Sequence, residues 1–209
     1  MSDIILKLLL AYVIGSIMGS LLLGKMRHVD IRSMGSGNAG GTNALRTQGK
    51  AFALGVVIID IGKGALAAGW VPYLALTSTE PTAAWLSFAC GAAAVVGHVY
   101  PIFHGFRGGK GAATLVGTIL VLAPMLVLPL LAVWVLTIAL TGFVGLATMV
   151  TGEAALLLTI AFYQFDKLEL LVYTFVMGMF IVFTHRSNIG RMLQGTEPRN
   201  ERMMLLRKR

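Results

Sequence analysis

A run of short hydrogen-bonding residues set between glycines occupies residues 34–46, MGSGNAGGTNALR. The glycines let backbone N–H groups converge, the hydroxyls and amides can donate hydrogen bonds, and the terminal guanidinium can grip phosphate oxygens with two N–H groups. This composition is typical of an anion-binding loop. The candidate ligands are Ser36, Asn38, Thr42, Asn43 and Arg46. The simpler alternative is a glycine-rich turn in which Ser36 or Thr42 only caps a helix.

The spacing of Gly35, Gly37 and Gly40 also matches G-x-G-x-x-G, the fingerprint of dinucleotide-binding loops. That fold needs a strand before the glycines and a βαβ unit of about 30 residues around them. Here the glycines follow a long apolar run and a basic connector. The sequence therefore favours a phosphate site of another kind.

A second glycine-rich segment, FRGGKGAAT, begins at Phe106. A Walker A loop needs Gly five residues before its last Gly and Ser or Thr after its Lys, whereas His104 and Gly111 occupy those positions. Nucleotide hydrolysis is therefore not supported. We expect a second anion cradle, with a basic anchor at the membrane edge as the alternative. Its residues are Gly108, Gly109, Lys110 and Gly111.

A third polar segment, HRSNIGRMLQGTE, covers residues 185–197. If it continues as a helix, His185 and Asn188 share a face and both can point at one ligand. Arg186 and Arg191 suit a basic collar at the membrane surface equally well.

Ionisable residues also occur inside apolar runs, where charge is costly and is a functional candidate by default. Asp60 and Lys63 are three residues apart and predict an internal ion pair, with substrate contact or a position near the surface as alternatives. His98 and Glu153 have no evident partner in the sequence. Cys90 is expected to be a small buried apolar residue.

The elements that position these segments must lie in a membrane. Apolar residues make up 56% of the 209 residues and charged residues 12%, and the mean hydropathy is +0.80. The first apolar run, residues 4–24, is long enough to cross the roughly 30 Å hydrocarbon layer as a helix, and no cleavage pattern follows it. The net charge of +8 does not indicate a nucleic-acid partner, because the charge is concentrated in the loops.

The distribution of charge predicts the orientation. Residues 25–50, residues 104–111 and the tail from residue 185 hold 14 of the 17 Lys and Arg residues. The N-terminus with Asp3 and the loop with Glu80 hold acids instead. By the positive-inside rule, the N-terminus is extracytoplasmic, while the basic segments and the C-terminus are cytoplasmic.

Residues 112–184 must then cross the membrane an even number of times. A run of 73 residues with several breaking points and one polar turn predicts four short spans. Those points are Pro124, Pro129, Gly142 and Gly145, and the turn is Asp166, Lys167 and Glu169. We therefore expect an all-α bundle of seven transmembrane helices, with five as the alternative, forming one polytopic domain over residues 1–209. Gly15 and Gly19 are expected to allow close helix approach.

The segments GSGNAGGTNALR, FRGGKGAAT and HRSNIGRMLQGTE resemble, in order and spacing, the three cytoplasmic motifs of the PlsY family. These are bacterial acyl-phosphate:glycerol-3-phosphate acyltransferases. The one departure is Gly41, where the family usually has Ala. The resemblance implies transfer of an acyl group from acyl phosphate to the 1-hydroxyl of glycerol 3-phosphate. The products are lysophosphatidate and phosphate, and the step is the first committed acylation of phospholipid synthesis.

The resemblance also implies residue roles. The residues that bind glycerol 3-phosphate would be Ser36, Asn38, Thr42, Asn43, Arg46, His185 and Asn188. The segment for the acyl-phosphate group would be Gly108, Gly109, Lys110 and Gly111. The catalytic residues would be Ser36, Arg46, Lys110 and His185. The resemblance further implies a protein of the bacterial cytoplasmic membrane whose site faces the cytoplasm and which needs no cofactor or metal. It also implies a cytosolic partner, the PlsX enzyme, that makes the acyl phosphate.

The residues agree with direct transfer. No His is followed by Asp in the H-x-x-x-x-D pattern of other glycerolipid acyltransferases, and Ser36 lacks a base-and-orienter arrangement. An acyl phosphate is already activated, so alignment and charge stabilisation by Lys110 and Arg46 can suffice without an acyl-enzyme. The proton passes to a phosphate oxygen or to His185. A transporter for phosphorylated metabolites is the rival, but outer loops nearly free of Lys and Arg count against it, and a purely structural subunit leaves the polar loops without a purpose.

Overall fold

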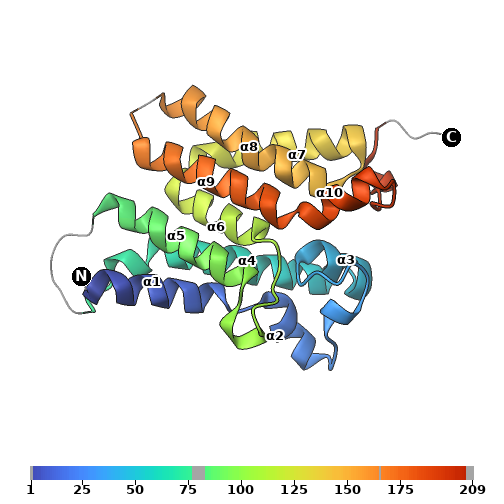
Figure 1. The fold of residues 1–209 in the computed structure, drawn as a ribbon, viewed down its shortest axis with the longest axis horizontal. Helices are drawn as coiled ribbons and strands as arrows, with labels where there is room; N and C mark the ends of the chain where they lie inside the picture. The colour runs from blue at the N-terminus through green and yellow to red at the C-terminus, as the bar shows by residue number, and fades with distance from the viewer. Residues whose placement is uncertain (1, 77–82, 165, 206–209) are drawn as a thin grey trace. The chain divides into compact units, whose positions relative to one another are not determined.

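The computed structural model describes residues 2–76, 83–164 and 166–205, and within these ranges it contains helices and no strand (Figure 1). The all-helical prediction is therefore confirmed for the described part of the chain. Glu80 and the loop around it, which supported the predicted orientation, lie outside those residues. The chain divides into two compact units, residues 1–122 and residues 123–209. The single polytopic domain over residues 1–209 stays a prediction.

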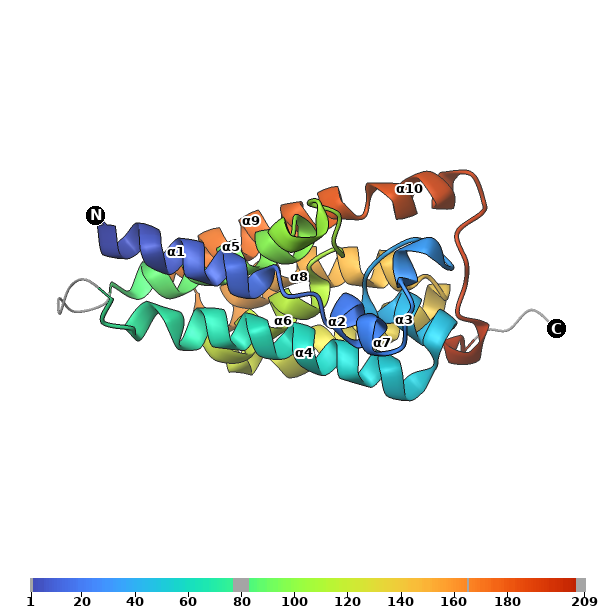
Figure 2. The same ribbon diagram turned by 90° about the horizontal axis from the view of Figure 1, so that it is seen from below.

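In the first unit, the other α-helices described there all pack against α4, the long teal helix in Figure 2. The α-helices are α1 (Ser2–Gly15), α2 (Gly19–Met26), α3 (Gly41–Gln48), α4 (Lys50–Gly69), α5 (Ala84–Val99) and α6 (Ala112–Leu122). Short 3-10 turns lie at Ile31–Ser33, Val71–Tyr73 and Ile102–His104. The two glycine-rich segments belong to this unit, one between α2 and α4 and the other between α5 and α6.

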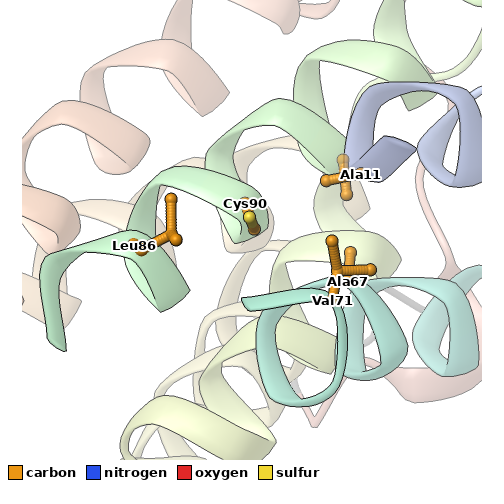
Figure 3. Packing of buried hydrophobic residues seen from close by; sticks show 6 residues of the cluster. Ala11, Ala67, Val71, Leu86 and Cys90 are labelled. Carbon is orange, nitrogen blue, oxygen red and sulfur yellow. The ribbon is translucent and has the colours of Figure 1, made fainter. Parts of the chain in front are cut away.

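Small residues at the crossing points let the helices of the first unit approach closely. A Cβ on Gly15 would collide with the backbone of Ala94, and one on Gly19 would lie 2.9 Å from the carbonyl oxygen of Val56. The predicted purpose of these two glycines is confirmed. Cys90 is fully buried in an apolar cluster with Ala11, Ala67, Val71, Leu86 and Ala94, as expected (Figure 3).

The first apolar run is not one helix, and this corrects the prediction for residues 4–24. The chain bends by 46° between α1 and α2. The break leaves backbone groups that a continuous helix would pair. Lys63 Nζ donates to the carbonyl oxygen of Ile17 at 2.6 Å, and the Gly19 N–H donates to Asp60 Oδ1 at 3.3 Å. The expected ion pair between Asp60 and Lys63 is confirmed, with 3.0 Å between Oδ1 and Nζ. The pair provides hydrogen-bond partners for the backbone groups that the break leaves unpaired.

The second unit contains α7 (Val127–Thr141), α8 (Val144–Tyr163), α9 (Leu168–Thr184) and α10 (Arg186–Leu193), with 3-10 turns at Pro124–Leu126 and Glu201–Met203. The breaks fall at Pro124 and at Gly142, whose φ of +75° suits glycine. Pro129 and Gly145, also expected as breaking points, lie instead in the first turns of α7 and α8, where proline and glycine are tolerated. Glu153 is exposed on α8.

The helices agree with a multi-pass membrane protein. Among the described residues, four helical stretches are long and apolar enough to span a membrane: Lys50–Tyr73, Ala84–His104, Pro124–Thr141 and Val144–Tyr163. Two bent pairs, α1 with α2 and α9 with α10, raise the number to six if each counts as one span. The helix α6 is apolar but has 11 residues, so it reaches only about half of the hydrocarbon thickness. The number seven therefore stays a prediction.

Candidate active site

The first loop, residues 31–40, is held in shape by the side chain of Asn43. Its Nδ2 donates to the carbonyl oxygens of Ile31 at 2.9 Å and Met34 at 3.0 Å, and its Oδ1 accepts the Ser36 N–H at 2.9 Å. Asn43 is 1% exposed. Gly35 adopts a φ of +57°, and a Cβ there would collide with Asn43 Oδ1. This amide is therefore engaged by the loop itself.

The other predicted ligands of the first loop face outward. Ser36, Thr42 and Arg46 are exposed and Asn38 is half-buried. Thr42 and Arg46 lie one turn apart on α3, so they share a face. The N-cap of α3 is Gly40, with no side-chain hydrogen bond to the cap, so neither Ser36 nor Thr42 serves as a helix cap there. Hydroxyls, a guanidinium and a helix N-terminus together form a surface suited to an anion.

No strand precedes the G-x-G-x-x-G glycines within the described residues, because α2 and a 3-10 turn come before them. The dinucleotide-binding fold is therefore excluded for this segment, as the sequence favoured.

The second loop folds back on the end of α5. The N–H groups of Gly108 and Gly109 donate to the carbonyl oxygens of Val99 and His98, each at 3.1 Å. Gly111 has a φ of +86° and accepts the first hydrogen bond of α6 from Leu115 at 2.8 Å. Lys110 is half-buried between these glycines, at the N-terminus of α6. The loop thus presents the N-terminus of α6 and an ammonium group to an anion, whereas the N–H groups of Gly108 and Gly109 are already bound to the end of α5.

Arg32 joins the two loops, a link that the sequence does not predict. Its Nη1 donates to the carbonyl oxygens of His104 and Arg107, each at 3.3 Å, and its Nη2 is 2.7 Å from Asp30 Oδ2. The hydrogen bonds from Arg32 hold the pKa of the Asp30 carboxyl below its usual range, and the same pairing raises the pKa of Arg32. In the sequence these two residues are only an acid and a base two positions apart, and nothing there points to a partner 72 residues away.

The third segment belongs to the second unit. The chain bends by 52° at the junction of α9 and α10, so the segment does not continue the last span as one straight helix; His185 lies at the bend as the N-cap of α10, and Asn188 follows in the first turn of that helix. His185 Nδ1 lies 2.7 Å from the carbonyl oxygen of Ile181. Asn188 Nδ2 donates to Glu197 Oε1 at 2.7 Å, and Arg191 Nε donates to Glu197 Oε2 at 2.7 Å.

Glu197 was not among the predicted site residues, yet this carboxylate is 8% exposed and orients Asn188. The signal in the sequence was one of only two acids, Glu197 and Glu201, within a basic tail.

The structure therefore brings the predicted residues together in two groups. The first loop and the second loop are tied to each other in the first unit, and His185 lies near Asn188 in the second unit. In residues 2–76, 83–164 and 166–205, no group of three or more His, Cys, Asp and Glu residues is placed to hold a metal ion.

The family model for glycerol-3-phosphate acyltransferases matches residues 5–195. The chain belongs to the glycerol-3-phosphate acyltransferase family. This family member is 43% identical over 198 residues to the glycerol-3-phosphate acyltransferase of Bacillus velezensis, covering 94% of this chain and 97% of that protein. It is 41% identical over 197 residues to the enzyme of Bacillus subtilis strain 168, with the same coverage.

The fold of this family member is similar to two solved structures of PlsY, an integral membrane glycerol 3-phosphate acyltransferase. The glycerol 3-phosphate form gives a TM-score of 0.82 and the lysophosphatidic acid form 0.80. Each is 34% identical in sequence, and the match covers 94% of both chains. The resemblance drawn from the three motifs is therefore confirmed, and the apolar helices are those of a multi-pass membrane acyltransferase.

Proposed function

We propose that this acyltransferase takes its acyl group from an acyl phosphate and passes it to the 1-hydroxyl of glycerol 3-phosphate, giving lysophosphatidate and inorganic phosphate. The main support is the joining of two anion-binding loops by Arg32. A reaction between two phosphorylated substrates needs two such loops close together. Further support comes from the two similar solved structures of PlsY, one in a glycerol 3-phosphate form and one in a lysophosphatidic acid form.

The exposed groups of the first loop bind glycerol 3-phosphate in this proposal. Arg46 pairs with its phosphate, and Ser36 and Thr42 hydrogen-bond to phosphate or hydroxyl oxygens, with Asn38 at the edge. His185 and Asn188 bind the same substrate, as the resemblance implies. Asn43 acts through Ser36, because its own amide is already bound to the loop backbone.

The second loop receives the acyl-phosphate group. The backbone of Gly108, Gly109 and Gly111 approaches the phosphate oxygens without a side chain between them, and Lys110 offsets their charge. A positive charge at this point also stabilises the phosphate as it leaves.

The reaction is a direct transfer. The 1-hydroxyl oxygen of glycerol 3-phosphate attacks the carbonyl carbon of the acyl phosphate and forms the ester bond. The bond from that carbon to the bridging oxygen breaks, and phosphate departs with the electron pair. The hydroxyl proton goes to a phosphate oxygen or to His185. No covalent acyl-enzyme is formed, because the mixed anhydride is already activated.

The two proton routes make different predictions for His185. A carbonyl oxygen only accepts, so the short contact of Nδ1 with Ile181 assigns the ring hydrogen to Nδ1 and makes Nε2 the acceptor of the neutral ring. If His185 takes the proton, His185→Gln lowers kcat. If a phosphate oxygen takes it, His185→Gln raises the KM for glycerol 3-phosphate and leaves kcat nearly unchanged.

The protein acts in the bacterial cytoplasmic membrane with its site facing the cytoplasm, its N-terminus outside and seven spans in this proposal. The support is the charge distribution and the helix breaks. Cysteine labelling on either side of residue 166 separates seven spans from five. A cytosolic acyl-phosphate synthase of the PlsX type supplies the donor.

The test supplies purified protein with palmitoyl phosphate and glycerol 3-phosphate and measures lysophosphatidate, with acyl-CoA and acyl-carrier protein as alternative donors. We expect product from the acyl phosphate alone. Arg46→Ala should raise the KM for glycerol 3-phosphate about 10-fold or more, as loss of a charge-assisted pair does. Arg27→Ala, which removes an arginine stacked on Phe52 instead, is the matched control and should be near wild type. Absence of product from acyl phosphate rejects the proposal.

A further inference from the structure

A buried charged cluster lies in the first unit, and the reaction above gives it no role. It consists of Asp60 and Lys63 on α4 and His98 on α5, all 5% exposed or less. Asp60 Oδ1 is 3.0 Å from Lys63 Nζ and 3.6 Å from His98 Nδ1. Asp60 Oδ2 and His98 Nδ1 are both buried and make no hydrogen bond to the part of the chain that the structure describes. A buried ion pair is often no more stabilising than well-packed apolar side chains, so its presence calls for a reason beyond stability.

One side of the cluster holds the first loop through α2. Lys63 and Asp60 bind the backbone groups freed at Ile17 and Gly19, where α2 begins. The next residue, Ser20, donates from Oγ to the carbonyl oxygen of Ala39 at 2.7 Å. Ala39 lies in the glycine-rich run itself. The position of this run therefore depends on where the charged pair sets the start of α2.

The other side of the cluster holds the second loop. The backbone carbonyl of His98 accepts the Gly109 N–H at 3.1 Å. The imidazole reaches the same residue, since a Cβ on Gly109 would collide with His98 Nε2. A Cβ on Gly108 would instead collide with the backbone carbonyl oxygen of His98. The ring thus lies between Asp60 on one side and Gly109 on the other.

We propose that Asp60, Lys63 and His98 are positioning residues that fix the two substrate loops in place relative to each other. The Asp60–Lys63 pair acts on the first loop through α2, and His98 acts on the second loop through Gly109. Asp60 contacts both Lys63 and His98, so it connects the group that acts on the first loop with the group that acts on the second loop. The proposal rests on the proposed function, in which these loops receive glycerol 3-phosphate and acyl phosphate.

The first experiment tests the contact of His98 with the second loop by a double-mutant cycle. Gly109→Ala should lower kcat/KM for acyl phosphate about 10-fold or more in the wild-type background, because the methyl group displaces the loop. In the His98→Ala background the same change should cost less than about 3-fold, since the imidazole is gone. Gly108→Ala is the matched control, because it meets a backbone oxygen that His98→Ala leaves in place. Its cost should be equal in both backgrounds, and equal costs for Gly109→Ala overturn the proposal.

The second experiment separates positioning from stability by comparing KM values. His98→Gln should raise the KM for acyl phosphate and leave that for glycerol 3-phosphate within about 2-fold, and Lys63→Gln should do the reverse. Asp60→Asn should raise both. The double change Asp60→Asn with Lys63→Gln removes both charges together, so it keeps a folded protein to measure if a single change unfolds it.

The control for this second experiment is another buried ion pair. Asp3 and Lys7 lie 2.7 Å apart in the first turns of α1. Asp3→Asn with Lys7→Gln should lower the melting temperature and leave both KM values unchanged. If the variants of Asp60, Lys63 and His98 likewise change only the melting temperature, the inference is wrong. If wild-type protein makes no lysophosphatidate, the proposed function fails instead.

Discussion

The first loop and the segment after α9 each contain a buried asparagine, and the two side chains are held in different ways. Asn43 is bound by three backbone groups of its own loop. Asn188 is bound by the carboxylate of Glu197, which also takes Arg191. The first arrangement uses neutral backbone groups 7 to 12 residues earlier in the chain, whereas the second uses a carboxylate nine residues later. Charge-assisted bonds are stronger, but they fail when one partner loses its charge.

A glycine stands against each of the two asparagines. A Cβ on Gly35 would collide with Asn43 Oδ1, and a Cβ on Gly145 would lie 2.6 Å from Asn188 Nδ2. Each amide therefore needs a residue without a side chain beside it. The comparison shows that an asparagine in a glycine-rich motif can be a structural support, while the hydroxyl and guanidinium groups around it stay exposed for a ligand.

The largest effect is expected at Asn43. Asn43→Ala removes three hydrogen bonds from a buried site, a loss of about 2–3 kcal/mol, and it releases the backbone of Ser36. We expect kcat/KM for glycerol 3-phosphate to fall about 100-fold, together with the melting temperature. Leu45→Ala, an exposed change on the same helix, should leave both near wild type. Near-normal kinetics in Asn43→Ala would show that the loop keeps its shape without this amide.

Glu197 provides the charged counterpart. Glu197→Ala leaves the amide of Asn188 without this acceptor, and we expect the KM for glycerol 3-phosphate to rise about 10-fold. Glu197→Gln keeps an oxygen for Asn188 and loses only the ion pair with Arg191, so its effect should be about 3-fold. The two variants should differ in steady-state kinetics. Equal effects would mean that the charge, and not the bond to Asn188, is what matters.

A smaller effect is expected where the two loops meet. Arg32→Ala removes the bonds to the carbonyl oxygens of His104 and Arg107, and both KM values should rise about 3-fold to 5-fold. Asp30→Asn leaves those bonds in place and serves as the matched control. If Asp30→Asn is as damaging as Arg32→Ala, the ion pair and not the link between the loops is responsible.

The smallest effect is a pH dependence at Asp30. Its pKa is lower in the folded protein than the ordinary value of 3.8, because Arg32 binds the carboxylate. Its contribution to stability is therefore fully present above that value and is lost as the pH falls through the folded pKa. The difference in melting temperature between wild type and Asp30→Asn should shrink as the pH is lowered from about 7 to about 3. A difference that stays constant contradicts this assignment.

The sequence by itself determined the class of protein, the three polar segments and two of the helix breaks. Composition and charge distribution are properties of the chain as a whole, and Pro124 and Gly142 act on the backbone next to them. The residues of the three motifs were enough to identify the family. They did not show that Asn43 is a buried support of the loop while Ser36 is exposed, because both are short polar residues in the same run.

Only the tertiary structure decided which of these side chains point inward and which distant groups meet. In the sequence, residues 15–19 are part of a continuous apolar run, and nothing marks the break between α1 and α2. The ion pair that binds the backbone groups at this break comes from a helix more than 40 residues later. Arg32 reaches a loop 72 residues away, and His98 meets Asp60 across two helices. Such pairs depend on how packed helices present their faces, which local residue patterns do not encode.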